Sequence, residues 1–185
     1  MAQHTLSVLV ENSPGVLARV AGLFARRGYN IDSLAVGPTE NPTISRMTIV
    51  LNLEGHALDQ VSAQLFKLVN VIGIQEMKSD DSHQRELLFV KVKRNGDSTA
   101  ISELASRYNG RIVDEGDSTV TIEAIGTSKD LESLLKSLQS FGIRELAQSG
   151  LIAMEKGDAT LVERTLSETG LATSESHSQT ADYQN

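Results

Sequence analysis

Two hydrophobic periodicities alternate along this chain in a fixed order, and that order constrains the fold more than any other feature. Apolar residues at every second position indicate half-buried strands, and apolar residues three or four apart indicate helix faces. The first 78 residues therefore predict strand, helix, strand, strand, helix, strand. The strands are expected over 5–11, 30–37, 47–53 and 71–77, and the helices over 14–27 and 58–68.

Local signals mark the ends of the first predicted helix. Ser13 is a good N-cap, and Pro14 suits the first helical position because its missing N–H would be unpaired there anyway. Gly15 would then occupy the second helical position, and Gly28 ends the helix as a C-terminal glycine. The run 37–42 contains two prolines and predicts a turn between the second and third strands.

The same order begins again after a polar stretch. Strands are expected over 87–92, 111–114, 119–125 and 143–153, and helices over 101–108 and 131–138. A helix with one apolar stripe packs on one face of a four-stranded antiparallel sheet. We therefore predict an α+β chain of two consecutive ferredoxin-like βαββαβ domains, at 1–78 and 87–157. A linker at 79–86 and a mobile polar tail at 158–185 complete the prediction.

Composition narrows the function classes. The net charge is −7 and the sequence pI about 5.1, which argues against nucleic acid, because that affinity rests on neutralising phosphates. Cysteine is absent, so a disulfide framework or a thiolate metal site is excluded. No apolar run approaches the ~20 residues that span a bilayer, and no targeting segment opens the chain. We expect no membrane association and a cytoplasmic location.

Catalytic chemistry is not indicated. The four histidines lie in separate segments without a second ligand or nucleophile at a useful spacing, and Asp80-Asp81 alone offers too few oxygens for a metal. The glycines do not follow a phosphate-loop spacing. RNA-binding domains of this topology stack bases on aromatic residues of the central strands, and these strands carry none. We expect neither a catalytic residue nor a cofactor or metal in this chain.

The turn before the first helix has the chemistry of an amino-acid site. Unpaired N–H groups and a partial positive charge at a helix start suit a carboxylate, and Gly15 leaves room over these donors. The Asn12 amide can accept from an ammonium group and also donate. The alternative, which the residues alone favour, is a well-capped strand-to-helix turn without a ligand.

The segment 11–20 (ENSPGVLARV) resembles the start of an ACT domain, the amino-acid-binding module of many regulated biosynthetic enzymes. With Arg-Gly-Tyr-Asn-Ile at 27–31 and Ser-Arg-Met-Thr at 45–48, the chain from residue 5 to about 160 resembles the small regulatory subunits of acetolactate synthase. The segments 27–31 and 45–48 are more specific to this family than the segment 11–20, which is common to ACT domains in general. Residues beyond Gly157 fall outside the resemblance.

The resemblance implies a regulatory subunit with no active site of its own. In the family, the catalytic subunit uses thiamine diphosphate, Mg²⁺ and FAD, and the small subunit activates it and confers feedback inhibition, usually by valine. Valine lies between two ACT domains whose sheets pair side by side, so a homodimer is expected. The implied ligand-binding residues are Asn12, Gly15, Val16 and Leu17 of one chain with Asn30 and Ile31 of its mate.

Several assignments stay open at this stage. Val16 and Ile31 would form an apolar wall for the ligand or serve only as core, and Leu17 is expected in the core, contacting ligand through its backbone. Arg46 is a candidate contact with the catalytic subunit or a surface ion pair. The second domain is expected to aid dimerisation or docking. Alternative functions are an ACT module serving another enzyme or transporter, and a stand-alone enzyme.

Overall fold

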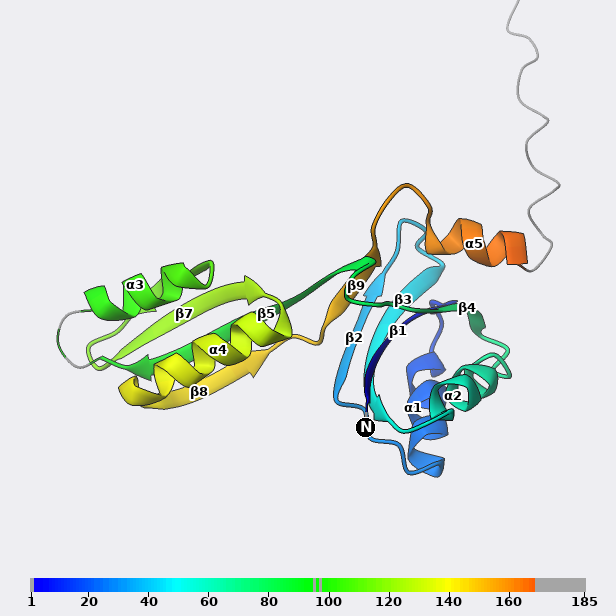
Figure 1. Ribbon diagram of the computed structural model, residues 1–185, viewed down its shortest axis with the longest axis horizontal. Helices are drawn as coiled ribbons and strands as arrows, with labels where there is room; N and C mark the ends of the chain where they lie inside the picture. Colours follow the sequence, from blue (N-terminus) through cyan, green and yellow to red (C-terminus); the bar gives the residue numbers. More distant parts are fainter. Residues whose placement is uncertain (1, 95, 97, 169–185) are drawn as a thin grey trace, which may run out of the picture.

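The computed structural model describes residues 2–94, 96 and 98–168, which form two βαββαβ units arranged end to end (Figure 1). The elements of the first unit are β1 (Ala2–Glu11), α1 (Val16–Arg26), β2 (Ser33–Pro38), β3 (Ile44–Leu53), α2 (Ala57–Leu65) and β4 (Val71–Glu76). Those that follow are β5 (Ser82–Lys93), α3 (Thr99–Arg107), β6 (Gly110–Glu115), β7 (Thr119–Gly126), α4 (Ser128–Leu138), the 3-10 turn η1 (Gln139–Phe141), β8 (Ile143–Gln148), β9 (Ile152–Glu155) and α5 (Leu161–Glu168).

The first sheet is antiparallel, with strand order β2-β3-β1-β4. Alternate side chains of β1 and β3, including Val8 and Ile49, pack against the apolar stripes of α1 and α2 on one face. Gly28 has φ 69°, and its N–H and that of Tyr29 bond to the carbonyls of Ala25 and Phe24 at 3.1 Å. These two bonds make the Schellman motif that ends α1, as the glycine predicts.

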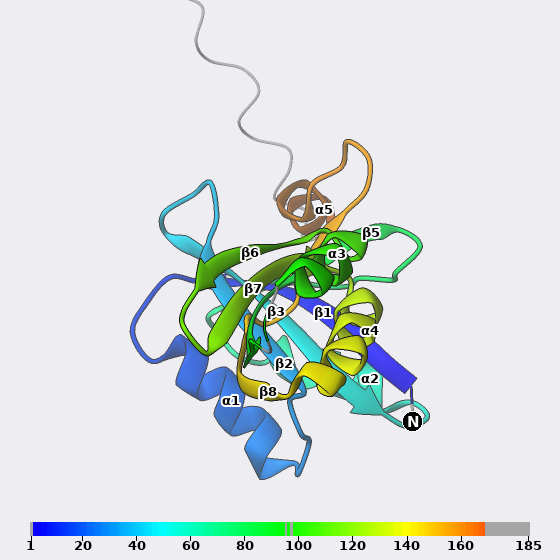
Figure 2. The same ribbon diagram turned by 90° about the vertical axis from the view of Figure 1, so that its left-hand side faces the viewer.

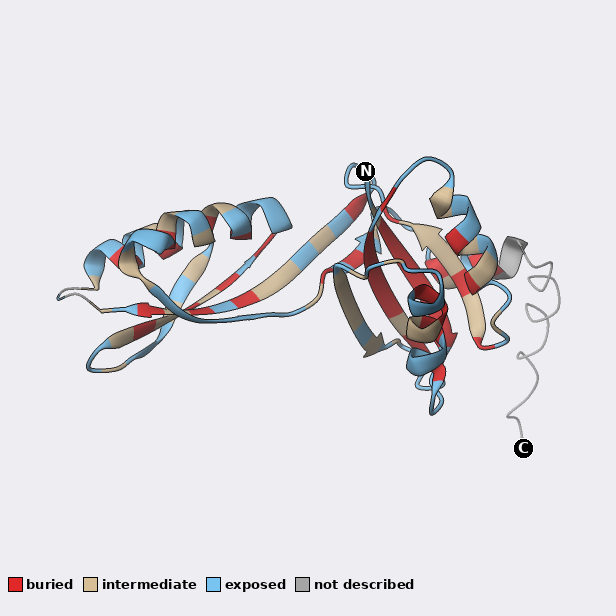
Figure 3. Cartoon of the chain, turned by 90° about the horizontal axis from the view of Figure 1, so that it is seen from below, coloured by how far each residue is buried: buried red, intermediate tan, exposed pale blue. Residues whose placement is uncertain are grey.

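The second sheet has the order β6-β7-β5-β8, and α3 and α4 lie together on one of its faces (Figures 1 and 2). Leu88, Ile122 and Leu134 are among its fully buried side chains. Figure 3 shows buried residues gathered in the strands of the two sheets and in the inward sides of their helices. The predicted class, two consecutive ferredoxin-like units, is confirmed.

The connection between the units is a strand pair rather than a linker. Strand β5 begins at Ser82, inside the predicted linker 79–86, and residues 82–85 pair with β9 before β5 enters the second sheet. The predicted strand 143–153 is accordingly two strands, because β8 and β9 pair with different parts of β5. We call residues 82–85 and 152–155 the ribbon.

The ribbon lies on the face of the first sheet that α1 and α2 leave open. Ala153 packs with Leu9 and Met77 there, and the Leu151 N–H donates to Ser33 Oγ at 2.8 Å. Ser7 and Thr48, polar residues on this face, are buried as a result. The first sheet is therefore covered on both sides.

Helix α5 occupies part of the segment predicted as a mobile tail, 158–185. Its start is fixed by a capping box, in which the Glu163 N–H donates to Thr160 Oγ1 at 3.1 Å and the Thr160 N–H donates to the Glu163 carboxylate at 3.0 Å. Leu161 and Thr165 are buried against the sheet and ribbon. The tail prediction is wrong for 161–168, and 169–185 lie outside the described residues.

Among the helices that the structure describes, none has the length and hydrophobicity needed to cross a bilayer.

Candidate functional site

The turn between β1 and α1 is a β-turn that precedes the helix, not the first turn of the helix itself. Gly15 has φ 85° and ψ −7°, the values of the third residue of a type II turn, and the Val16 N–H reaches the Ser13 carbonyl at 3.4 Å. Pro-Gly at the two central positions favours this turn. The prediction that Ser13 caps a helix starting at Pro14 is therefore wrong, because Gly15 is the N-cap and α1 starts at Val16.

Glycine at position 15 has two consequences. The left-handed backbone there disfavours any residue with a Cβ. A Cβ built at this position would meet no atom within 4 Å, so the space above the turn is open to a ligand.

Asn12 fixes the other end of the turn to the loop between β2 and β3. Its backbone N–H donates to the Thr43 carbonyl at 2.7 Å, and its side-chain nitrogen donates to the Pro42 carbonyl at 2.9 Å. The side chain is exposed, so its amide oxygen remains available as an acceptor for a cation.

The start of α1 suits an anion. No side chain caps it, and its first turn contains no acidic residue. The N–H groups of Leu17 and Ala18 have no intrahelical acceptor at these positions. These donors and the helix dipole together favour a carboxylate.

A buried asparagine that the sequence analysis missed braces this turn. The Arg19 guanidinium donates to Asn70 Oδ1 at 2.6 Å, and Asn70 Nδ2 donates to the Glu11 carboxylate at 2.5 Å. The Glu11 N–H also donates to the Asn70 carbonyl at 2.9 Å. Asn70 thus joins the strand before the turn to the helix after it. Nothing in the local pattern signals this, because Asn70 lies 51 positions from Arg19 and 59 from Glu11.

Of the two alternatives for Val16, ligand wall or core, the structure supports the core, whereas Leu17 lies at the surface. The Val16 side chain is buried in the core between sheet and helices, whereas that of Leu17 is 44% exposed. The expectation that Leu17 belongs to the core is wrong. The buried stripe of α1 starts at Val16 and continues through Val20, and Leu17 lies about 100° around the helix axis from Val16. Leu17 is thus the apolar side chain that this turn presents to solvent.

Asn30 and Ile31 lie at the opposite end of α1. The eleven residues of this helix span roughly 16 Å at 1.5 Å per residue. Asn30 is exposed and its side chain donates to Asp32 Oδ1 at 2.7 Å, while Ile31 packs partly against the core. One chain therefore does not bring the two predicted halves of the site together.

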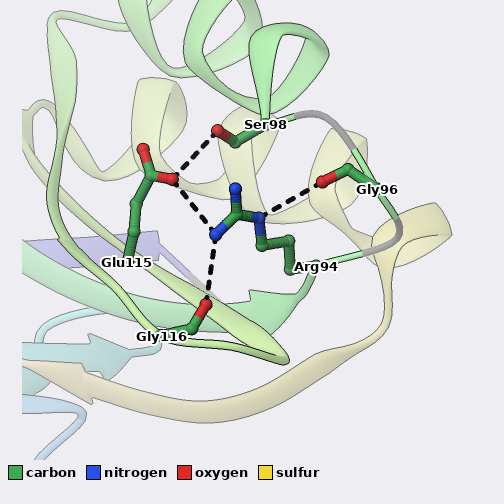
Figure 4. Close-up of polar contacts among 5 residues, drawn as sticks. All are labelled: Arg94, Gly96, Ser98, Glu115 and Gly116. Atoms are coloured by element: carbon green, nitrogen blue, oxygen red, sulfur yellow. Dashed lines mark hydrogen bonds and ion pairs between the residues drawn. The ribbon is translucent and has the colours of Figure 1, made fainter.

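Arg94 of the second unit connects two segments of the backbone. Arg94 donates to the carbonyls of Gly96 at 3.2 Å and Gly116 at 3.3 Å and pairs with the Glu115 carboxylate at 3.5 Å, to which Ser98 also donates (Figure 4). The network ties the segment before α3 to the turn between β6 and β7.

Within the residues that can be described, no three His, Cys, Asp or Glu side chains are grouped to hold a metal.

Comparison with known proteins gives the same two-part division. A family model described as an AHAS small subunit-like ACT domain matches residues 6–73, and one described as the small subunit of acetolactate synthase matches 85–157. The chain is 50% identical over 155 residues to an acetolactate synthase small subunit of Mycolicibacterium smegmatis, covering 83% of this chain and 91% of that protein.

More distant relatives agree. A probable acetolactate synthase small subunit of Methanothermobacter thermautotrophicus is 42% identical, with 85% of this chain and 95% of that protein covered. The crystal structure of the acetolactate synthase small subunit from Thermotoga maritima superposes with a TM-score of 0.79 at 32% identity, covering 86% of this chain and all of that one.

Proposed function

The chain belongs to the acetolactate synthase small-subunit family, and we propose that it activates the catalytic subunit and confers feedback inhibition by valine. As a small subunit with an ACT regulatory domain, it has a regulatory role and no catalytic site of its own. The proposal adds the ligand, its site between two copies of the chain, and the direction of both effects.

The positions of the turn 12–17 and of residues 30–31 at opposite ends of β2 support this proposal. Strand β2 lies at the edge of the first sheet, where a second copy could add its own β2 in antiparallel orientation about a two-fold axis. The turn 12–17 lies at the end of the sheet where β2 finishes, and residues 30–31 lie where β2 begins. Reversal of the partner's β2 would therefore bring its Asn30 and Ile31 toward this turn, and would make two equivalent sites.

The chemistry of the turn suits valine. The ligand carboxylate would accept from the N–H groups at the start of α1, and its ammonium would donate to Asn12 Oδ1. The exposed Leu17 side chain and the Ile31 of the second copy would enclose the branched side chain, whose burial contributes about 1.5–3 kcal/mol. A partly buried helix terminus adds up to ~2 kcal/mol, so these two contributions together, at most about 5 kcal/mol, correspond to a Kd of roughly 0.2 mM or weaker.

Inhibition would follow from a ligand that bridges two chains. Valine bound between the two chains would favour one arrangement of the paired sheets. A coupling free energy of ~1–3 kcal/mol between the valine site and the catalytic subunit is enough for regulation. The thiamine diphosphate, Mg²⁺ and FAD of the reaction would belong to that subunit, and this chain would need no cofactor.

Calorimetric titration with valine, leucine and isoleucine, with and without the catalytic subunit, tests the proposal. Gly15→Asp would place a carboxylate beside that of the ligand and should abolish valine inhibition while leaving activation. Gly15→Asn is the matched control, because it has the same size and the same strain at φ 85° without the charge, and asparagine tolerates this conformation. Equal valine binding by Gly15→Asp and by the unaltered chain would refute the site.

Asn30→Ala tests the other half of the site. It should weaken valine binding although residue 30 lies at the far end of α1 from the turn. A chain that sediments as a monomer yet binds valine with unchanged affinity would refute the two-chain site. Failure to co-purify with a thiamine-dependent partner would instead favour an ACT module that serves another protein.

A further inference from the structure

The α2–β4 loop, residues 66–70, holds two large apolar side chains in solvent. Phe66 is 52% exposed and Val69 is 85% exposed, the highest value for a large apolar residue in the described part of the chain. The backbone of the loop is fixed at both ends. The Phe66 N–H donates to a carbonyl of α2 at 3.0 Å, and the Asn70 carbonyl accepts from the Glu11 N–H at 2.9 Å. Apolar side chains on a fixed backbone lose little freedom on binding, which suits the anchor residues of a protein interface.

The α2–β4 loop lies away from the sheet edge at which two copies of the chain would pair. It leads into β4, and the strand order β2-β3-β1-β4 places β4 and β2 at opposite edges (Figure 1). Three strand spacings, about 14 Å, separate these two strands. Arg46, predicted as a candidate contact with the catalytic subunit, lies opposite Gly37 of β2 and therefore on the side of the second copy. Pairing through β2 would leave the α2–β4 loop open to another partner.

The charges beside the loop favour an acidic partner. Lys67 is exposed between the two apolar residues and forms no ion pair with any residue that the structure describes. Arg19 donates to Asn70, a neutral side chain, and the Glu11 carboxylate accepts from the same asparagine. Two cations and one anion thus border the loop in a chain of net charge −7. A carboxylate of the partner would find its cation at Lys67.

The loop is joined to the turn before α1 through one residue. Val69 directly precedes Asn70, whose side chain bonds to Glu11 before the turn and to Arg19 after it. Regulation by valine needs a coupling between the valine site and the surface that contacts the catalytic subunit. A contact at this loop would supply that coupling, because a shift of the turn would move Asn70 and the residue beside it.

We propose that the α2–β4 loop binds the catalytic subunit, with Phe66 and Val69 in an apolar hollow of that subunit and Lys67 facing a carboxylate at its rim. The assignment rests on the proposed function, which supplies the partner. A second copy of the chain is disfavoured here, because a two-fold contact centred on the loop would oppose each Lys67 to its own equivalent. A head-to-tail contact, added to the pairing through β2, would continue into open assemblies.

The test measures the Kd of the full chain for its cognate catalytic subunit. Val69→Asp would place a charge in the apolar hollow, Phe66→Ala would remove the larger anchor, and Lys67→Glu would reverse the unpaired charge. Matched controls are Val69→Ile, which stays apolar, and Lys136→Glu, an exposed lysine in the last turn of α4. Each test variant should raise the Kd at least ~tenfold, and each control should change it less than ~threefold. The melting temperature should stay unchanged for Val69→Asp and Lys67→Glu, because both positions are exposed.

Valine titration of the chain alone separates this assignment from the valine site. The three test variants should bind valine with unchanged affinity, whereas Gly15→Asp should lose valine and keep the catalytic subunit. The assignment is overturned if all three test variants associate with that subunit like the unaltered chain, or if they change only the oligomeric state of the chain alone. No association by the unaltered chain would overturn the proposed function, and this surface with it.

Discussion

Gly150→Ala should detach the ribbon from the first sheet. Gly150 lies directly over the peptide between Leu34 and Ala35, and a Cβ there would stand 2.5 Å from the Leu34 carbonyl carbon and 2.7 Å from the Ala35 nitrogen. The obstructing atoms are backbone in a paired strand, so they cannot rotate away. The segment that carries Gly150 must move instead.

The size of the effect follows from this geometry. Carbon atoms pack at 3.5–4.0 Å, so the segment must retreat by roughly 1 Å. Overpacking of this kind costs about 1–3 kcal/mol, and loss of the hydrogen bond from Leu151 to Ser33 adds about 0.5–1.5 kcal/mol. Since the two terms overlap, we expect a total near 2–3 kcal/mol. That corresponds to a fall of about 8–24 °C in the melting temperature of the first unit.

Gly37→Ala is the matched control for this substitution. It lies on the same sheet, has an ordinary φ and adds a methyl group in open space, so it should stabilise by about 0.4–1 kcal/mol through the unfolded chain. Calorimetric melting and amide exchange of residues 152–155 would be compared for both variants. If Gly150→Ala melted like Gly37→Ala with the ribbon amides still protected, the inferred close packing would be wrong.

Two further substitutions test the bracing of the turn and the cap of α5. Asn70→Ala removes the hydrogen bonds to Arg19 and Glu11 from a buried position. It should lower the free energy of unfolding, measured with denaturant, by ~1–3 kcal/mol, and it should weaken valine binding. Unchanged valine affinity would exclude a positioning role for Asn70. Hydrogen bonds from the Thr160 backbone and side chain lower the pKa of Glu163 below its ordinary 4.5. The stabilisation is complete above pH 4.5 and is lost as the pH falls through the lower folded value. Glu163→Gln should therefore flatten the acid dependence of α5 helicity, followed by circular dichroism, and an unchanged dependence would contradict the cap.

The features that could be predicted from the sequence are those fixed by local periodicity and local backbone preference. The two βαββαβ orders follow from apolar spacing, and the end of α1 follows from Gly28, whose φ of 69° few other residues adopt. Both depend on residues within one or two turns of each other. Such signals are strong because no distant partner is needed to satisfy them.

The ribbon could not be predicted, because its pairing joins residues about seventy positions apart and its outer side chains break the pattern of a polar surface. Helix α5 has a local signal in the sequence, since Thr160 followed three residues later by Glu163 is a capping-box pattern. At the turn, both a helix start and a type II turn fit Ser13-Pro14-Gly15. The structure selects the second, and the buried stripe of α1 begins at Val16 rather than at Leu17.

The turn before α1 and the ribbon have a continuous physical connection. Asn70, which braces the turn, directly precedes β4. Strand β4 packs at Gly73 against Thr165 of α5, and α5 is paired to β9 of the ribbon through Arg164 and Glu155 at 2.6 Å. Spatial continuity alone does not establish coupling, so the coupling between valine and the catalytic subunit must be measured. The factor by which valine changes the Kd of the catalytic subunit must equal the factor by which that subunit changes the Kd of valine. A factor of one in both directions would show that valine and the catalytic subunit bind independently.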